Sequence, residues 1–167
     1  MQDLVFQDTP ERFRPVAEEI VPPLLALLWE RSGLEEEIHR RLKARHREYL
    51  AAGGSPDQLP PGEPELWEEY RRRYLELVRP RCTPGLLKHG AVDSCARPGK
   101  YSLFAAGCQV SFAMRTAKKA VVELSCPRGS LRFIYRFTLQ PGPAGWLVAR
   151  IQYHHSNETV WHIDHYL

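Results

Sequence analysis

The side chains best suited to chemistry gather near the end of the sequence, in a histidine-rich tail. They are His154, His155, Trp161, His162 and Asp164. On a helix, His162 and His165 would share one face and could bind a metal. On a strand they point to opposite faces, and His162 then aligns with Asp164. Because we expect the tail to end a sheet, we interpret it as edge or partner-contact residues, with no metal site and no cofactor.

A catalytic acid or base in the second half of the chain would have to come from four carboxylates. These are Asp93, Glu123, Glu158 and Asp164. Glu123 stands in the middle of an apolar run, and a buried carboxylate has a raised pKa that lets it accept a proton. The favoured interpretation is that Glu123 faces solvent and pairs across strands with Arg132 or Arg136.

Other common reaction centres are missing from the sequence. It contains no glycine-rich phosphate loop, no H-E-x-x-H and no G-x-S-x-G. The four cysteines form no C-x-x-C pair, so zinc-ribbon and thioredoxin-like chemistry have no support.

The start of the chain carries acidic residues and no apolar signal segment, and the most apolar stretch, 20–29, is half of what a membrane span needs. We therefore expect a cytoplasmic protein that does not enter a membrane. Its cysteines are expected as reduced, buried thiols, with Cys108 and Cys126 on the apolar faces of strands.

Helical patterns fill residues 1–90. Thr9-Pro10 is typical of a helix start, and an apolar stripe follows over 16–28. A break or kink is expected at Pro22-Pro23, because the residue before a proline is pushed out of the helical region. Ser32-Gly-Leu-Glu35 matches a capping box, which predicts a new helix start.

That helix is expected to end at Gly53-Gly54, the start of a Gly/Pro-rich loop at 53–64. A further helix is predicted over 66–78. Thr83-Pro84 then begins a short helical turn that Gly90 ends.

Apolar and polar residues alternate in four segments after Gly99, which predicts an antiparallel sheet. The segments are 108–114, 120–126, 131–139 and 146–153. Tyr135 lies on the apolar side of the third segment, whereas Arg132 and Arg136 lie on its polar side. In the fourth, Leu147 and Ala149 are expected on the apolar side. Helices followed by antiparallel strands predict a single α+β domain over 1–167, helical over 1–90 and a sheet over 91–167.

The net charge of +3 conceals two oppositely charged parts. Residues 1–80 carry 16 acidic and 12 basic side chains, whereas residues 81–167 carry 4 acidic and 11 basic ones. Each part is therefore a candidate binding face. Basic charge alone could attract nucleic acid, but no row of stacking aromatic residues accompanies Arg132, Arg136 and Lys118-Lys119, which argues against that function.

The sheet half also resembles a known superfamily. The segments that carry this likeness are Pro98-Gly-Lys-Tyr-Ser-Leu-Phe104, Cys108-Gln-Val-Ser-Phe112, Lys119-Ala-Val-Val-Glu123, Leu131–Leu139 and Gly145–Tyr153. Over residues 66–167 the chain resembles the nuclear transport factor 2-like superfamily. Trp161-His-Ile-Asp164 makes it most similar to the bacterial immunity proteins of polymorphic toxin systems that share this fold.

The resemblance implies a cone-shaped fold, in which N-terminal helices pack on a strongly bent antiparallel sheet. It also implies an inhibitor that has no catalytic residues and neutralises a cognate protein toxin by direct binding. The tail (His154, His155, Trp161, His162, Asp164) and the row of Arg132 and Arg136 are the expected contact surface. Acidic helices over 10–52 are the alternative surface.

Two further classes share the fold. An isomerase or dehydratase would work in the mouth of the cone, with Glu123, Tyr135 or Asp164 as the acid or base, or with His154. A scaffold protein would use the cone to form a homodimer.

Overall fold

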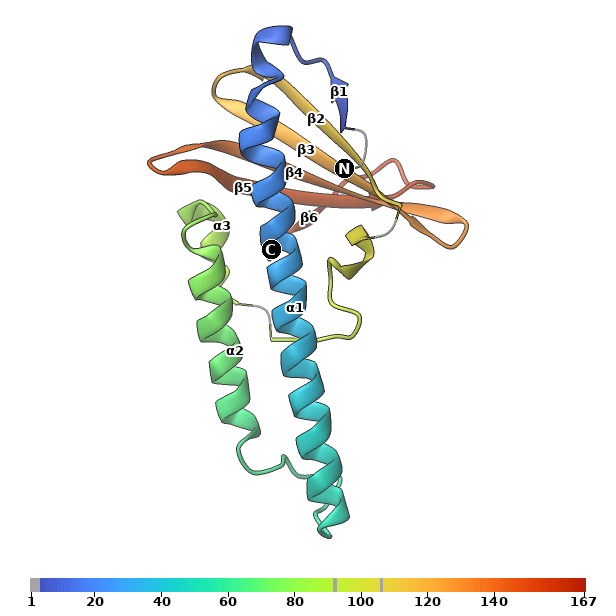
Figure 1. The fold of residues 1–167 in the computed structure, drawn as a ribbon. Coiled ribbons are helices and arrows are strands. Elements are labelled where there is room, and N and C mark those ends of the chain that lie inside the picture. The colour runs from blue at the N-terminus through green and yellow to red at the C-terminus, as the bar shows by residue number, and fades with distance from the viewer. Residues whose placement is uncertain (1–3, 92, 106) are drawn as a thin grey trace.

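A long helix and a shorter second helix pack against one face of a six-stranded sheet (Figure 1). The computed structural model describes residues 4–91, 93–105 and 107–167. The helices are α1 (Val16–Ala51), α2 (Glu63–Val78) and α3 (Pro84–Leu87), with short 3-10 turns at Glu11–Phe13 and Ser102–Ala105. The strands are β1 (Leu4–Gln7), β2 (Gln109–Thr116), β3 (Lys119–Arg128), β4 (Leu131–Gly142), β5 (Gly145–His155) and β6 (His162–Asp164). The prediction of an α+β fold is confirmed.

The sheet is mixed and open, in the order β1-β2-β3-β4-β5-β6. Strands β2 to β6 are antiparallel, as predicted for the four long segments, but β1 runs parallel to β2. Thr9 secures this extra strand, since its hydroxyl donates to the Gln7 carbonyl (2.7 Å) and accepts from the Met114 N–H (3.1 Å). The wholly antiparallel prediction is therefore wrong at this edge, and Thr9 does not cap a helix.

The inward faces of the strands agree with the alternation except in β5. The register shifts between Thr138 and Leu139 of β4, because Ala149 of β5 is an extra residue there, so that Val148 and Ile151 point into the core, 2% and 0% exposed. The prediction that Leu147 and Ala149 face the core is wrong, because one extra residue in a strand turns the alternation over.

Helix α1 is continuous over 36 residues, about 54 Å at 1.5 Å per residue. The predicted break at Pro22-Pro23 does not occur. Both prolines lie on the exposed side of the helix, where water can satisfy the two carbonyl groups that lose their N–H partners. Ile20, Leu24 and Leu28, all nearly inaccessible, hold the other side against the core.

The predicted capping box at Ser32 and Glu35 is also wrong, because both residues are buried within α1. Ser32 Oγ accepts from the Tyr101 N–H (2.8 Å), and Glu35 accepts from the Lys100 N–H (2.8 Å). Glu35 also pairs with Arg31, which is 1% exposed. These side chains hold the loop before β2 against the helix instead of capping a helix end.

The predicted thiols Cys108 and Cys126 are buried, but they form a disulfide instead of remaining reduced. The register explains the pairing. Gln109 lies opposite Ser125, so Cys108, one residue earlier, meets Cys126 with a Cα–Cα distance of 4.2 Å. Cys82 and Cys95 are free.

The remaining helix ends agree with the sequence patterns. Helix α1 ends just before Gly53, which has a φ of +87°, and α2 and α3 fill the segments predicted for them. Within the described ranges, no helix combines the length and the apolar character that crossing a bilayer requires.

Candidate binding face

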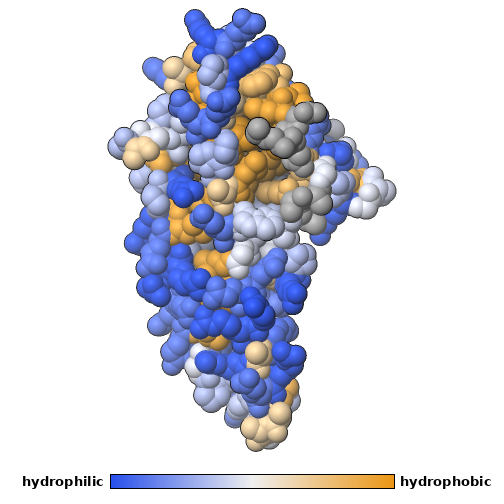
Figure 2. All heavy atoms as spheres, viewed as in Figure 1, coloured by the Kyte–Doolittle hydropathy of each residue, from blue (hydrophilic) through white to orange (hydrophobic). Residues whose placement is uncertain are grey.

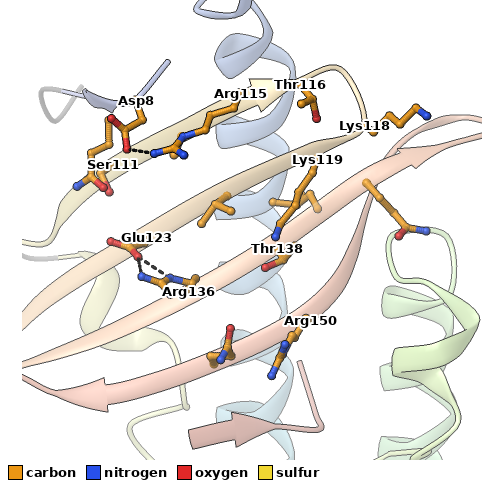
Figure 3. Close-up of a pocket in the computed structure, with 16 residues that line it drawn as sticks. Asp8, Ser111, Arg115, Thr116, Lys118, Lys119, Glu123, Arg136, Thr138 and Arg150 are labelled. Atoms are coloured by element: carbon orange, nitrogen blue, oxygen red, sulfur yellow. Dashed lines mark hydrogen bonds and ion pairs between the residues drawn. The ribbon is translucent and has the colours of Figure 1, made fainter. Parts of the chain in front are cut away.

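The face of the sheet opposite α1, called the open face here, is hollowed into a trough of about 700 Å³ (Figure 3). Its floor consists of the outward side chains of β2 to β5, which alternate with the core residues. In the register, Glu123 lies beside Arg136 and Arg136 beside Gln152, while Val121, Thr138 and Arg150 form the adjacent row. No residue of a helix lines the trough.

The trough is basic. Its cations come from four strands and one turn: Arg115, Lys118, Lys119, Arg136 and Arg150. Two of them have acidic partners, since Arg115 pairs with Asp8 (2.6 Å) and Arg136 with Glu123 (2.5 Å). Lys118, Lys119 and Arg150 are exposed and form no ion pair with any described residue. We call these five residues and their two acidic partners the basic trough.

Arg136 is held by two partners. Its Nε donates to Glu123 (2.6 Å), and its guanidinium lies 3.8 Å from the centre of the Trp161 ring. Trp161 in turn contacts His154, with ring centres 4.2 Å apart. The favoured interpretation of Glu123 as a cross-strand partner of arginine is confirmed, and contacts with Arg136 and His154 hold Trp161 beside this pair.

Two further residues of this face behave differently: Arg132, which was predicted, and Ile163, which the sequence analysis did not single out. Arg132 donates from Nε to the Ser125 hydroxyl (2.7 Å) and from Nη2 to the Ser125 carbonyl (2.5 Å), so it is tied to the neighbouring strand. Ile163 lies opposite Gln152 and is 51% exposed, which places an apolar side chain beside the tryptophan. We call Trp161 and Ile163 the apolar shelf.

The rest of the tail does not join this face. His155 and His162 approach the two oxygens of Glu158, at 3.4 and 3.5 Å. The His155 N–H, together with these two rings, lowers the pKa of Glu158. No group of three or more His, Cys, Asp or Glu residues is placed to hold a metal ion, as far as the described ranges extend.

Asp164 lies on the inner side of the sheet, where it pairs with Lys100 (2.6 Å). Lys100 also donates to the Tyr166 carbonyl (2.8 Å), and its burial lowers its pKa although Asp164 opposes that shift. A shallow pocket of about 420 Å³ contains Tyr135, Asp164 and Lys100. Burial raises the pKa of Tyr135. Glu123 is on the opposite face, so the three residues predicted for an enzyme do not form one site.

A second hollow of about 420 Å³ lies between α1 and the sheet, where apolar side chains gather (Figure 2). Leu25 and Trp29 of α1 face Phe104, Val110 and Leu124 across it. The hollow offers no carboxylate or histidine. It is an opening into the core that Tyr101 also lines, and burial raises the pKa of this tyrosine.

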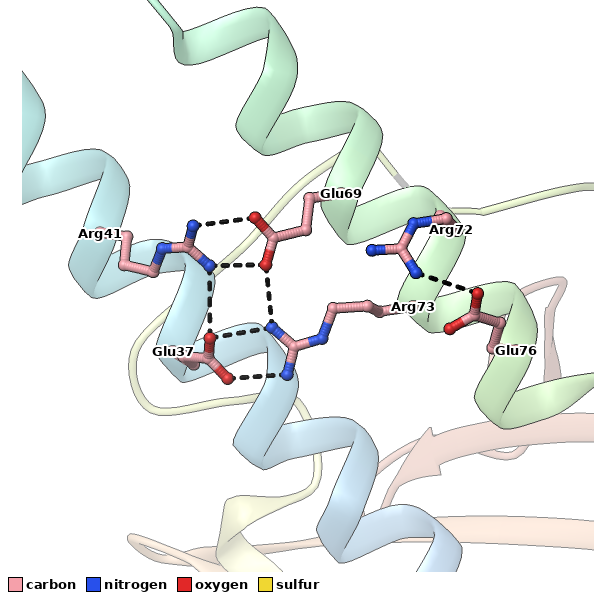
Figure 4. Close-up of polar contacts among 6 residues, drawn as sticks. All are labelled: Glu37, Arg41, Glu69, Arg72, Arg73 and Glu76. Carbon is pink, nitrogen blue, oxygen red and sulfur yellow. Dashed lines mark hydrogen bonds and ion pairs between the residues drawn. The ribbon is translucent and has the colours of Figure 1, made fainter.

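The helical layer neutralises its own charges. In α1, seven carboxylates stand among six basic residues. Between α1 and α2, Arg41 binds Glu69 through two hydrogen bonds (2.6 and 2.8 Å), and Arg73 binds Glu37 (2.8 and 2.9 Å; Figure 4). The expected acidic surface over 10–52 therefore carries charges of both signs, and of the seven carboxylates of α1 only Glu35 and Glu37 form ion pairs with described residues.

Sequence reasoning had noticed Lys118 and Lys119 but missed Arg150, Arg115 and Thr138. The signal for Arg150 was present, because the residue alternates with the core positions of β5 two places before Gln152. Finding it required the pairing of four strands, which no single segment contains.

Comparison of the chain with protein-family models, with curated proteins and with solved structures finds no match in any of the three.

Proposed function

We propose that this protein is a bacterial immunity protein that neutralises a cognate protein toxin by binding it through the open face of the sheet. The observation that carries the proposal is the basic trough, in which three cations that pair with none of the described carboxylates stand on an exposed, concave surface. Carboxylates of a partner protein can pair with these three cations directly, because no ion pair with a described residue has to break first.

The helical layer is the weaker candidate for the contact surface. Seven carboxylates and six basic residues stand together in α1, so its net charge is close to zero, and two of those carboxylates, Glu35 and Glu37, already pair with arginines. The family resemblance favours an inhibitor, and the trough favours an acidic contact surface on the toxin. In this proposal the protein acts in the cytoplasm of the producing cell.

The test is co-expression with the product of the neighbouring open reading frame, followed by co-purification and binding kinetics. The variant is Lys118→Glu, Lys119→Glu and Arg150→Glu. The matched control is Arg40→Glu, Lys43→Glu and Arg47→Glu, three exposed cations of α1 that change the net charge equally.

We expect the wild type and the control to rescue growth, and the trough variant to fail. Its association rate should fall at least 10-fold in 50 mM salt, with a smaller difference at 0.5 M, since salt screens charges beyond a few ångströms. Equal binding by the trough variant and the wild type would overturn the assignment of the face.

A second candidate is a small-molecule enzyme that uses Tyr135 and Asp164 in their shared pocket. Lys100 favours it, since a buried ammonium with a lowered pKa can exchange a proton more easily than an exposed one. If neither rescue nor co-purification occurs with the wild type, substrate screening with Asp164→Asn as the inactive control becomes the decisive experiment.

A further inference from the structure

The open face has two ends of different chemistry. One end holds Lys118, Lys119 and Arg150, all without acidic partners among the described residues. The other end holds the apolar shelf, where Ile163 is 51% exposed and Trp161 is partly exposed. Arg136 lies between Lys119 and the row of His154, in the same row as Gln152 and Ile163, and is neutralised by Glu123.

The register gives the separation of the two ends. Lys119, Val121, Glu123 and Ser125 follow one another on the open face of β3, and each step of two residues covers about 6.6 Å. Ser125 shares its row with Ile134 and His154, and the His154 ring contacts that of Trp161. The distance from Lys119 to the row of Trp161 is therefore about 20 Å, which an extended chain of about six residues spans.

The shelf is arranged in advance of any contact. The guanidinium of Arg136 lies on one part of the Trp161 ring and His154 on another, at 3.8 and 4.2 Å, so little rotamer freedom remains to be lost on binding. Fixed tryptophan side chains beside arginine are typical of the centre of binding energy in protein interfaces. In this arrangement Arg136 supports the tryptophan, and its charge is already satisfied.

The backbone of β3 and β4 offers nothing to an extended partner, because both of their edges are paired within the sheet. Recognition must come from side chains. It must also differ along the trough, with carboxylates preferred at the lysine end and an apolar group at the tryptophan end.

From these observations we propose that the partner inserts a single segment of about six residues, which has two or three carboxylates at one end and a large apolar side chain at the other. The carboxylates lie over Lys118, Lys119 and Arg150, and the apolar side chain lies on Trp161 and Ile163. This inference rests on the proposed function, because it specifies what the toxin presents to the same face.

Synthetic peptides test it without the toxin. The probes are acetylated, amidated hexapeptides: three Glu followed by Ser-Leu-Leu, the same peptide in reverse order, three Glu followed by three Ser, and three Gln followed by Ser-Leu-Leu. Binding to the full chain is followed by NMR titration in 50 mM salt. A thymidine oligonucleotide of the same charge is the probe for nucleic acid.

We expect one of the two mixed peptides to bind at least fivefold more tightly than the purely acidic and the purely apolar peptides. Trp161→Ala should remove the advantage of leucine only, and Lys118→Glu with Lys119→Glu and Arg150→Glu should remove the advantage of glutamate only. Ile163→Ser, a milder change at an exposed site, repeats the first comparison if Trp161→Ala lowers stability. Trp29→Ala, 59% exposed on the helical side, is the matched control and should change neither.

Three results would overturn the inference. The mixed peptides could bind no better than the acidic one, the Trp161 and Ile163 variants could leave the leucine advantage intact, or the oligonucleotide could bind as tightly as the best peptide. The first two leave toxin binding by the basic trough untouched, since that proposal is tested by co-expression. If the wild type fails to bind the toxin in co-expression but still shows the expected peptide selectivity, the proposed function is contradicted and this inference is not.

Discussion

Replacing Glu35 by glutamine leaves a positive charge alone in the core. The Arg31 side chain is 1% exposed and that of Glu35 is 6% exposed, and the two form an ion pair within α1. Burial by itself lowers the pKa of Arg31, but Tyr70 and Glu35 more than offset it and the pKa is raised, so the arginine stays charged. Glutamine has nearly the same shape and keeps an oxygen for the Lys100 N–H, so the substitution removes mainly the counter-charge.

Removing one partner of a buried ion pair lowers the free energy of unfolding by about 3–5 kcal/mol. We expect a value near 3 kcal/mol, because Arg31 keeps its hydrogen bond from Nε to the Leu167 carbonyl (2.8 Å). With a urea dependence of about 2 kcal/mol per molar, the midpoint of unfolding should fall by about 1.5 M. Circular dichroism at pH 7 measures it.

Glu36→Gln is the matched control. Glu36 accepts the Gly99 N–H (2.8 Å) in the same loop but is paired with no buried cation, so its loss should stay below about 1 kcal/mol. A double variant, Arg31→Met with Glu35→Leu, should be more stable than Glu35→Gln alone, since it strands no charge. If Glu35→Gln unfolds within 1 kcal/mol of the wild type, the buried pair does not stabilise the fold as described.

Two further predictions concern the disulfide and the helix pair. The Cys108–Cys126 bond joins residues 18 apart, and closing a loop of that length stabilises the fold by about 3 kcal/mol. A reductant should therefore lower the Tm of the wild type by about 6–12 °C in a thermal melt, and it should not change the Tm of the double variant Cys108→Ser with Cys126→Ser. An unchanged wild-type Tm would contradict the bond. The hydrogen bonds from Arg41 hold the pKa of Glu69 at about 2. The ionised Glu69 therefore adds its full contribution to the free energy of unfolding above about pH 4.3, and this contribution is lost as the pH falls toward 2. Because Glu69 is partly exposed, Glu69→Gln should lose about 0.5–1 kcal/mol at pH 7 and nothing at pH 2 in urea titrations; a gap that stays constant with pH would contradict this assignment.

The patterns that sequence reasoning read correctly are those with a long, regular period. Strands β3 and β4 keep the alternation of core and surface residues throughout, and the Glu123–Arg136 pair follows from it. The patterns misread are local signals that distant contacts override. Ser32 and Glu35 resemble a helix cap in isolation, but the loop at 99–101 uses both of them, and the apolar side of α1 carries the helix past its two prolines.

The candidate site shows the same division. Alternation placed Arg132 and Arg136 on the side of the sheet away from the core, whereas Lys119 was expected in the turn before the second strand segment. It did not reveal that Arg150 joins them, or that the tail divides at Trp161 between the open face and Glu158. These facts depend on the register across β4, β5 and β6, and a bulge in β5 changes that register by one residue. Pairing of this kind is set by the whole sheet and not by any one segment.

The position of β1 has a consequence for how the sheet assembles. Strands β2 to β5 are joined in sequence by short turns, so their pairing closes small loops. Leu4 pairs with Val110 only after a loop of more than a hundred residues has closed. Closing this loop costs more chain entropy than closing the short turns between β2 and β5, and only four residue pairs offset that cost. We expect the meander to form early, with β1 joining last and detaching first, so its amide hydrogens should exchange with solvent well before those of β3 and β4.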